Sequence, residues 1–473
     1  MIFRRFFDPK LAQTSYLIGC PITQEAIVVD PNRRIGRYLE AAAQEGLRIS
    51  HVTETHIHAD FLSGSRELAN RTGARLYLSG AAGPEWEYHY AADAGATILR
   101  DGDRLSVGRI ELRVLHVPGH TPEHLAFLVT DQDRAGEPMG VLTGDFIFVG
   151  DVGRPDLLER AVGSAGTMEQ SARQLFRSIQ RFHDLSDYLQ IWPGHGAGSA
   201  CGKSLSAVPQ STLGYEKRFN WAFGVSEEAA FVRAVLTGQP DPPRYFAEMK
   251  RINQAGPRAR GATGPSCRLP LPALTAALAA GGAVVDTRPA AEYAAGAIPG
   301  TINIPGTRAF TTWAGSLLPY GEEFHLIVGE SDEHRVEELV DDLAGIGLDQ
   351  VGGYFGSDVI ADWRESHGRL QTIPQATLDE MRTGSRNGNL VLDVRTKGEW
   401  EAGHVPGSVN MPIGELGQRL QEIPRTLPLT VHCQTGLRGA IAASLLRAAG
   451  FDQVRLFAGG FAQWRAAGQP IAI

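Results

Sequence analysis

Short apolar runs alternate with amphipathic stretches over the first half of the chain. The runs are typical of buried strands: SYLIG, EAIVVD, ISHVTETH, ARLYLS, ELRVLHVP, LAFLVT and MGVLTGDFIFV. Helical patterns lie between them, notably at residues 36–46 and 168–182. A Pro-rich segment at 239–243 and a stretch rich in Gly, Arg and Pro at 255–265 end the pattern. We therefore predict one large α/β domain over residues 1–255.

The rest of the chain contains an internal repeat. The segment VVDTR at residues 284–288 recurs as VLDVR at 391–395, and GAIPG at 296–300 recurs as GHVPG at 403–407, with a constant offset of 107 residues. A repeat of this length is a duplicated domain rather than a solenoid unit. Each copy runs strand, helix, strand, helix, which predicts two small α/β domains with parallel sheets. We place the copies at residues 263–368 and 372–473.

Composition limits the classes of partner. With 473 residues, of which 43% are hydrophobic, the chain has room for several domains with cores of their own. A formal net charge of −8 provides no basic field, so nucleic acid is not an expected partner. No stretch approaches the length of a membrane span, and the dispersed cysteines are typical of a reducing compartment. We expect a cytoplasmic homo-oligomer that acts on small molecules.

Candidate metal ligands follow several of the strand-like runs. Two imidazoles lie two residues apart in His56-x-His58, where an extended backbone presents both to one side. Glycine precedes three later candidates and allows close approach of the backbone. A single histidine of this kind is more often a hydrogen-bonded loop residue, and the sequence alone does not choose between His56 and His58. The order and spacing of the whole set nevertheless predict a metal site: His56, His58, Asp60, His120, Asp145 and His195.

This order of ligands resembles that of the metallo-β-lactamase superfamily over about residues 1–225, which implies an αββα sandwich. Members with the pattern HxHxDH, a later His, an Asp and a last His can hold two metals. Here Phe61 stands where the second-metal His belongs. Because a phenyl ring cannot ligate a metal, the sequence predicts a single-metal centre.

The remaining ligand set resembles that of the persulfide dioxygenase branch. The resemblance implies one Fe(II) per chain, held by His56, His120 and Asp145. The resemblance also implies that three further residues do not bind the metal but orient its ligands or hold water. These are His58, Asp60 and His195. Two imidazoles and one carboxylate on one face leave positions open for oxygen and substrate, and such a set favours Fe(II).

Two further residues are candidates for substrate binding in this domain. Arg154 follows the ligand Asp closely and is expected near a substrate carboxylate, with a surface salt bridge as the alternative. Cys201 lies in a glycine-rich loop after His195 and is expected to be exposed to a sulfur substrate. A small buried hydrophobe is the alternative for this cysteine.

The last copy of the repeat resembles a rhodanese domain over about residues 372–473. Its loop from Cys433 to Arg438 has the Cys-x-x-x-x-Arg pattern, in which backbone N–H groups surround the sulfur and stabilise a thiolate and a bound persulfide. The resemblance implies that Cys433 and Arg438 are catalytic. The loop residues that would bind the transferred sulfur are Gln434, Thr435, Gly436 and Leu437.

The middle copy keeps the framework of the repeat but not its nucleophile. Aligning Arg335 with Arg438 places Glu330 where Cys433 belongs. Without a thiol at this place the copy cannot carry sulfur. A spacer or docking role is the expectation.

The whole chain therefore resembles the bacterial fusions of a persulfide dioxygenase with two rhodanese-like domains. The resemblance implies oxygen-dependent oxidation of a low-molecular-weight persulfide at Fe(II), with sulfite and thiosulfate as products of sulfide detoxification. The main alternative is a glyoxalase II-like thioester hydrolase fused to a sulfurtransferase. A non-catalytic sulfur-binding or sensing protein is the other alternative, although it would need neither complete site.

Overall fold

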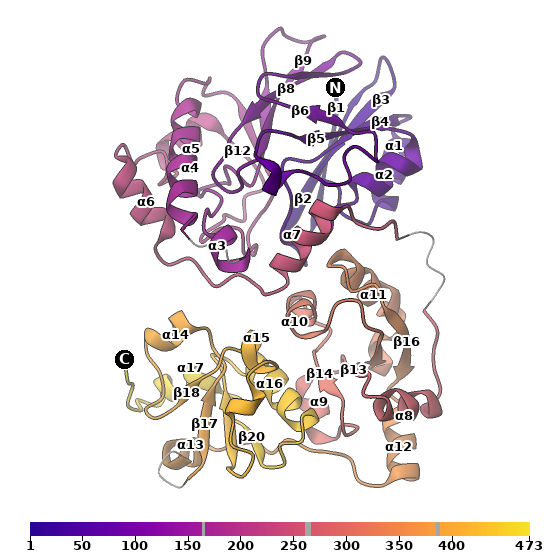
Figure 1. The fold of residues 1–473 in the computed structure, drawn as a ribbon, viewed down its shortest axis with the longest axis vertical. Coiled ribbons are helices and arrows are strands. Elements are labelled where there is room, and N and C mark those ends of the chain that lie inside the picture. Colours follow the sequence, from indigo (N-terminus) through magenta and orange to yellow (C-terminus); the bar gives the residue numbers. More distant parts are fainter. Residues whose placement is uncertain (163–165, 261–265, 385–387) are drawn as a thin grey trace. The chain divides into compact units, whose positions relative to one another are not determined.

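The computed structural model describes residues 1–162, 166–260, 266–384 and 388–473 (Figure 1). The chain divides into two compact units, Met1–Ala262 with Ala344–Gly347 and Thr263–Leu343 with Leu348–Ile473. The predicted domain start at residue 263 lies outside the described residues, so that boundary stays a prediction. None of the described helices combines the length and the apolar character that a transmembrane span requires.

Two mixed sheets form the first unit, and in its described part each has six strands. The first sheet has the order β1-β2-β3-β4-β5-β6: β1 (Ile2–Asp8), β2 (Gln13–Cys20), β3 (Glu25–Val29), β4 (Arg48–Thr53), β5 (Arg75–Ser79) and β6 (Thr97–Leu99). The second has the order β12-β11-β10-β9-β8-β7: β7 (Arg104–Val107), β8 (Ile110–His116), β9 (Leu125–Asp131), β10 (Gly140–Gly144), β11 (Gln190–Pro193) and β12 (Ser211–Thr212). All seven residues of β9 are buried, as expected for a strand covered on both faces.

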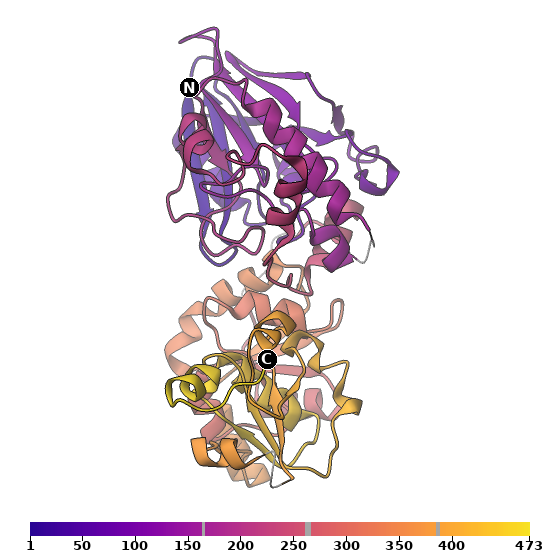
Figure 2. The same ribbon diagram turned by 90° about the vertical axis from the view of Figure 1, so that its left-hand side faces the viewer.

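Three apolar layers hold this unit together. Side chains from both sheets, such as Ile18, Val29, Leu112 and Phe127, form the central layer. Helices cover the outer faces: α1 (Gly36–Gln44) and α2 (Ser65–Thr72) pack on one sheet, and α4 (Met168–Phe182), α5 (Leu213–Phe219) and α6 (Glu228–Leu236) pack on the other. The unit also contains α3 (Leu157–Val162) and α7 (Phe246–Ala255). Figure 2 shows the long helix α4, whose buried residues recur at helical spacing, lying along one face. The layers therefore confirm the αββα sandwich that the resemblance implied.

The second unit contains the two copies of the repeat as parallel four-stranded sheets of identical topology in their described residues. The middle copy has the strand order β14-β13-β15-β16: α8 (Leu271–Ala279), β13 (Ala283–Asp286), α9 (Ala290–Ala295), β14 (Ile302–Asn303), α10 (Phe310–Leu317), β15 (Phe324–Val328), α11 (Val336–Gly345), β16 (Val351–Gly356) and α12 (Val359–His367). The last copy has the order β18-β17-β19-β20: α13 (Leu378–Gly384), β17 (Leu390–Asp393), α14 (Lys397–Glu401), β18 (Val409–Asn410), α15 (Ile413–Leu416), β19 (Leu429–His432), α16 (Leu437–Ala448), β20 (Val454–Leu456) and α17 (Gly460–Ala466).

Both copies share a buried ion pair at the end of their first strand. In the middle copy Arg288 donates from Nε and Nη2 to Asp286, and in the last copy Arg395 makes the same bonds to Asp393. Each guanidinium also donates to the carbonyl of the glycine that opens the repeated GxxPG motif. The hydrogen bonds therefore repeat with the sequence and confirm a duplicated fold.

The strand register corrects one detail of the alignment between the copies. Asp286 pairs with Ile327, whereas the equivalent Asp393 pairs with His432. The residue after His432 is Cys433, so its structural counterpart is Val328, and the predicted counterpart Glu330 is wrong by two residues. Val328 is fully buried and carries no nucleophile. The middle copy therefore still lacks a thiol at this place.

Candidate functional site

The candidate ligands lie in loops at the carboxyl ends of strands. His56 and His58 follow β4, His120 follows β8, Asp145 follows β10 and His195 follows β11. Strands β10 and β11 run parallel, which brings the last two to the same edge of their sheet. Loops at such strand ends are common sites of chemistry because a rigid scaffold positions them.

Two glycines allow the backbone to approach the site closely. A Cβ at Gly194 would lie 2.6 Å from Asp145 Oδ1, and a Cβ at Gly144 would lie 2.6 Å from Thr55 Oγ1. Gly144 also has φ of +50°, which side-chain-bearing residues rarely adopt. Larger residues at either position would therefore displace groups of the site.

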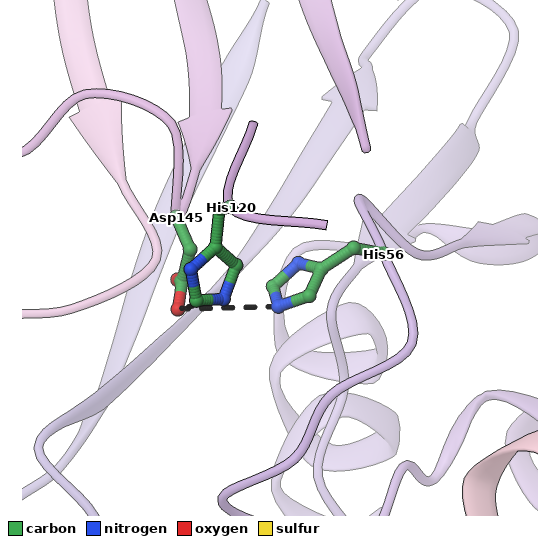
Figure 3. Close-up of side chains that lie close together, drawn as sticks. All are labelled: His56, His120 and Asp145. Carbon is green, nitrogen blue, oxygen red and sulfur yellow. Dashed lines mark ion pairs between the residues drawn. The ribbon is translucent and has the colours of Figure 1, made fainter. Parts of the chain in front are cut away.

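His56, His120 and Asp145 form a compact buried set (Figure 3). Asp145 Oδ2 lies 3.4 Å from His120 Nε2 and 3.9 Å from His56 Nε2. The three ligand atoms lie within 4.8 Å of one another. Among the described residues neither carboxylate oxygen of Asp145 has a hydrogen-bond partner, although the side chain is fully buried. A buried carboxylate without a partner is costly, and a cation at this point would satisfy it.

Hydrogen bonds to Nδ1 direct both imidazoles toward this point. Thr55 donates its hydroxyl to Asp30 Oδ2, which can only accept, and the hydroxyl oxygen is therefore left to accept from His56 Nδ1 at 2.9 Å. The Arg154 carbonyl accepts from His120 Nδ1 at 3.0 Å. In both rings the Nε2 lone pair is then free to bind a metal.

The ionisation of these imidazoles suits the same role. Burial lowers the pKa of His56 well below its usual value, and nearby imidazoles lower it further. Burial also lowers the pKa of His120, with Asp145 opposing the shift. Neutral imidazoles are the form that binds metals.

The structure distinguishes His56 from His58, which the sequence left open. His58 Nε2 lies 3.1 Å from Asp30 Oδ1, away from the Asp145 carboxylate. Burial lowers the pKa of His58, but Asp30 and other carboxylates outweigh this effect and raise it to about 9. His58 is therefore paired with the Asp30 carboxylate, and this pair supports the loop beside His56.

Three supporting residues were missed from the sequence, namely Asp30, Thr55 and His124. Asp30 accepts from the Thr55 backbone N–H at 2.6 Å and follows β3, the parallel neighbour of β4. That adjacency was the available signal, because carboxyl ends of neighbouring parallel strands meet at one edge. The His124 ring stacks on His56 at 4.7 Å between centroids, and its Nε2 accepts from the Asp145 backbone N–H at 3.0 Å.

Phe61 is fully buried, with its ring centroid 4.3 Å from that of His58. Asp60 Oδ2 lies 3.2 Å from His195 Nε2. The same nitrogen lies 3.4 Å from Asp145 Oδ2. Burial lowers the pKa of His195, but Asp145 and Asp60 outweigh it and raise the value well above the usual one.

The structure corrects the environments expected for Cys201 and Arg154. Cys201 is 2% exposed, so the expected exposure is wrong, and burial raises the pKa of its thiol to about 12. Arg154 is also buried, and it donates to both carboxylate oxygens of Asp156 at 2.8 and 2.7 Å and to the Ala200 carbonyl. The Arg154 guanidinium therefore makes its hydrogen bonds within the protein. Its ion pair with Asp156 is buried and does not lie at the surface.

The Cys433 loop lies between the end of β19 and the start of α16. The Gly436 backbone N–H donates to Cys433 Sγ at 3.1 Å. Gly436 has φ of +105°, and a Cβ there would lie 2.4 Å from the Ala458 carbonyl oxygen, so the turn requires glycine. The sulfur faces the N-terminus of α16, where backbone dipoles stabilise negative charge.

Arg438 in the first turn of α16 is held by a carboxylate. It donates to Glu399 through Nη1 and Nη2 at 2.6 and 2.8 Å. Glu399 also closes a capping box with Thr396 at the start of α14. Burial raises the pKa of Glu399, but Arg438 and Thr396 outweigh it and lower the value to about 2. The guanidinium at the rim of the loop therefore has a fixed position.

Comparisons with known proteins match both parts of the chain. The family model described as the metallo-beta-lactamase superfamily matches residues 8–195, and the rhodanese-like domain model matches residues 377–467. A solved metallo-beta-lactamase from Staphylococcus aureus subsp. aureus COL is 43% identical with a TM-score of 0.66, over 75% of this chain and 99% of that chain.

Two of the curated relatives differ in their named activity. A hydroxyacylglutathione hydrolase of Methylococcus capsulatus is 31% identical over 47% of this chain and 77% of its own length. The mitochondrial persulfide dioxygenase ETHE1 of Bos taurus is 28% identical over 41% of this chain and 68% of its own length. The chain belongs to the metallo-beta-lactamase superfamily and carries a rhodanese-like domain in its C-terminal part.

Proposed function

We propose that the protein is a non-haem Fe(II) persulfide dioxygenase coupled to a sulfurtransferase. The observation that carries the proposal is the convergence of two imidazoles and one carboxylate, those of His56, His120 and Asp145, on a chain that also presents Cys433 in a thiolate loop. The overall reaction converts R–S–SH, O₂ and water to R–SH and sulfite. Cys433 then carries a second sulfane sulfur to sulfite to give thiosulfate.

The donor set is typical of an Fe(II) site with open coordination positions. A structural metal site would have all its positions filled by the protein. It offers two imidazoles whose pKa values are lowered and, among the described residues, one carboxylate without hydrogen-bond partners, whereas His58 faces Asp30 instead. Such a set leaves coordination positions for two reactants. Fe(II) bound there would supply the redox chemistry that joins dioxygen to the persulfide sulfur.

The residues of the chain itself orient and enclose this site. Thr55 fixes the His56 ring, and the Arg154 carbonyl fixes the His120 ring, so both lone pairs keep their direction. The three ligand side chains are at most 2% exposed, which limits access of bulk water to the reacting sulfur. Arg154 thus contributes through its backbone carbonyl rather than by binding a substrate carboxylate.

The sulfur-transfer half relies on Cys433. Its thiolate attacks the outer sulfur of a persulfide, R–SH leaves, and the cysteine becomes a persulfide. Sulfite then takes that outer sulfur as thiosulfate and restores the thiolate. The Gly436 N–H and the α16 N-terminus are placed to stabilise the anionic sulfur at both stages.

A thioester hydrolase is the second candidate, favoured by the 31% identity to the hydroxyacylglutathione hydrolase. The two activities differ in their need for oxygen. The test uses the full chain, purified without oxygen and loaded with Fe(II), and supplies either glutathione persulfide or S-lactoylglutathione. We expect oxygen uptake with sulfite release from the persulfide, and no thioester cleavage. Thioester hydrolysis without oxygen uptake would refute the proposal.

A further inference from the structure

Four residues of the middle copy, Ala344–Gly347, belong to the first compact unit. They form the end of α11 and the turn after it, and we call them the strap. Two loops of the first unit bind the strap, one after β3 and one after β4. The first loop contains Asp30 and the second contains the segment His56–Asp60. The strap therefore contacts the part of the chain that builds the candidate metal centre.

These loops provide hydrogen-bond partners for the end of α11. The last carbonyls of a helix have no partner inside the helix, and positive charge near them is favourable. Arg33, three residues after Asp30 and 5% exposed, donates to the Ala344 carbonyl at 2.9 Å. The Leu62 N–H donates to the Gly345 carbonyl at 2.8 Å. Consecutive carbonyls of the strap therefore hold one residue of each loop.

The two loops are also tied to each other and to α7. The Gly64 N–H donates to the Pro31 carbonyl at 2.7 Å, which joins the loop after β4 to the loop after β3. Asn253 of α7 donates to the carbonyls of His58 and Phe61, both at 2.7 Å. A displacement of the strap would therefore reach the ligand loop through its backbone.

The last copy contains the same turn in a different setting. The sequence GLDQV, which starts at Gly347, recurs as GFDQV from Gly450, and the two glycines have φ of +80° and +83°. The three residues before Gly347 are buried, whereas the three before Gly450 are partly exposed. A Cβ at Gly347 would lie 3.2 Å from Leu62 Cδ1, whereas the nearest described atom to a Cβ at Gly450 is Arg425 Nη1 at 3.5 Å. Burial of this turn is therefore a property of the middle copy and not of the duplicated fold.

We propose that the strap positions the two loops of the candidate metal centre, and that the middle copy, which lacks a thiol, serves metal binding in this way. Arg33 holds the strap to the loop after β3, and Gly347 leaves room for Leu62 of the loop after β4. Both are positioning residues. Without the strap contacts the loops lose a shared support, so the ligands hold their geometry less firmly and release a metal faster. The inference rests on the metal centre of the proposed function, but not on the identity of the metal or on dioxygenase activity.

The test compares two strap variants of the full chain with matched controls. Gly347→Val inserts a side chain into the strap contact, and Gly450→Val introduces the same backbone strain at the equivalent turn of the last copy. Arg33→Met removes the donor to the strap but keeps an apolar side chain of similar length. Arg34→Met is its control, because Arg34 pairs with Asp8.

Two readouts follow the loop and the metal separately. Hydrogen exchange of the metal-free chain over residues 54–64 reports how firmly the ligand loop is held. Release of Co²⁺ to a chelator, together with its d–d absorbance, reports the metal centre without dioxygenase chemistry. Circular dichroism and thermal melting report overall folding.

We expect residues 54–64 to exchange faster in Gly347→Val and Arg33→Met. Both variants should release Co²⁺ at least about ten-fold faster, with altered d–d absorbance. The controls should stay within about two-fold of the parent. If Gly347→Val does not fold, Arg33→Met decides.

Exchange and Co²⁺ release like the parent's in folded strap variants, or equal increases in the controls, would overturn the proposal. A parent that takes up no oxygen but shows these differences would refute the proposed dioxygenase and support the strap.

Discussion

Replacing Glu399 by Gln removes one charge beside the Cys433 loop and preserves almost everything else. Gln is nearly isosteric and can still close the capping box with Thr396. The change isolates the ion pair with Arg438, whose side chain is only 19% exposed. Arg438 would keep its charge in a half-buried position without a carboxylate partner.

The expected loss follows from the pKa of Glu399. A shift from 4.5 to about 2 corresponds to about 3 kcal/mol. The Glu399 side chain is 33% exposed, so solvent screening reduces this figure, and Gln retains the bonds to Thr396. We therefore expect the variant to be less stable by about 1–1.5 kcal/mol at pH 7, or about 2–5 °C in Tm for a unit of this size.

The pH dependence provides a second check. Because the folded pKa is lowered, the stabilisation by Glu399 is complete above pH 4.5 and is lost as the pH falls toward about 2. Calorimetry of the full chain at several pH values should show the difference between parent and variant shrinking below pH 4.5. The control is Glu401→Gln on the same helix. Glu401 is 58% exposed, and its carboxylate is 3.7 Å from Lys397 Nζ, which makes this ion pair longer and more exposed to solvent than that of Glu399. Equal Tm values for the two variants at pH 7, or a difference that stays constant down to pH 3.5, would refute the reasoning.

Three further predictions concern the two sites. Alanine at His56, His120 or Asp145 should abolish both iron retention and oxygen uptake, because each removes a metal bond; elemental analysis that finds full iron in any of them contradicts the ligand set. Phe61→His restores an imidazole in the HxHxDH pattern and should make oxygen uptake more sensitive to added zinc; equal inhibition of variant and parent argues against Phe61 as the reason for a single-metal site. Cys433→Ser should lose thiosulfate sulfurtransferase activity while oxygen uptake persists and the product shifts from thiosulfate to sulfite; an unchanged thiosulfate yield would show that another group carries the sulfur.

The ligand set could be predicted from the sequence because strand ends and glycines mark it. The choice of His56 over His58 could not, since it depends on Asp30, which follows the neighbouring strand β3 and binds both the Thr55 hydroxyl and the His58 ring. His124 escaped notice for a similar reason, because its contact with Asp145 arises only when two strands of one sheet pair.

The remaining errors concern the counterpart of Cys433 and the exposure of Cys201, and both lie in segments between strands. The alignment of Glu330 with Cys433 failed because the segments between β14 and β15 and between β18 and β19, which contain α10 and α15, differ by two residues in length. Paired strands do not tolerate such a change in length, because it would shift their register. Cys201 was expected at the surface because its loop is rich in glycine, yet the Arg154 N–H and Ser199 hold it inside.

The duplication provides a natural comparison within one molecule. The middle copy has no nucleophile at the place of Cys433, yet it contains the buried Asp286–Arg288 pair, the counterpart of Asp393–Arg395. A feature that the copy without the thiol shares with the copy that has it does not depend on sulfur transfer, so we assign this pair to folding. A variant of Arg395 that loses sulfur transfer is therefore expected to lose stability as well. The chemical step is to be sought among the residues that differ between the copies, beginning with Cys433, whose counterpart is Val328.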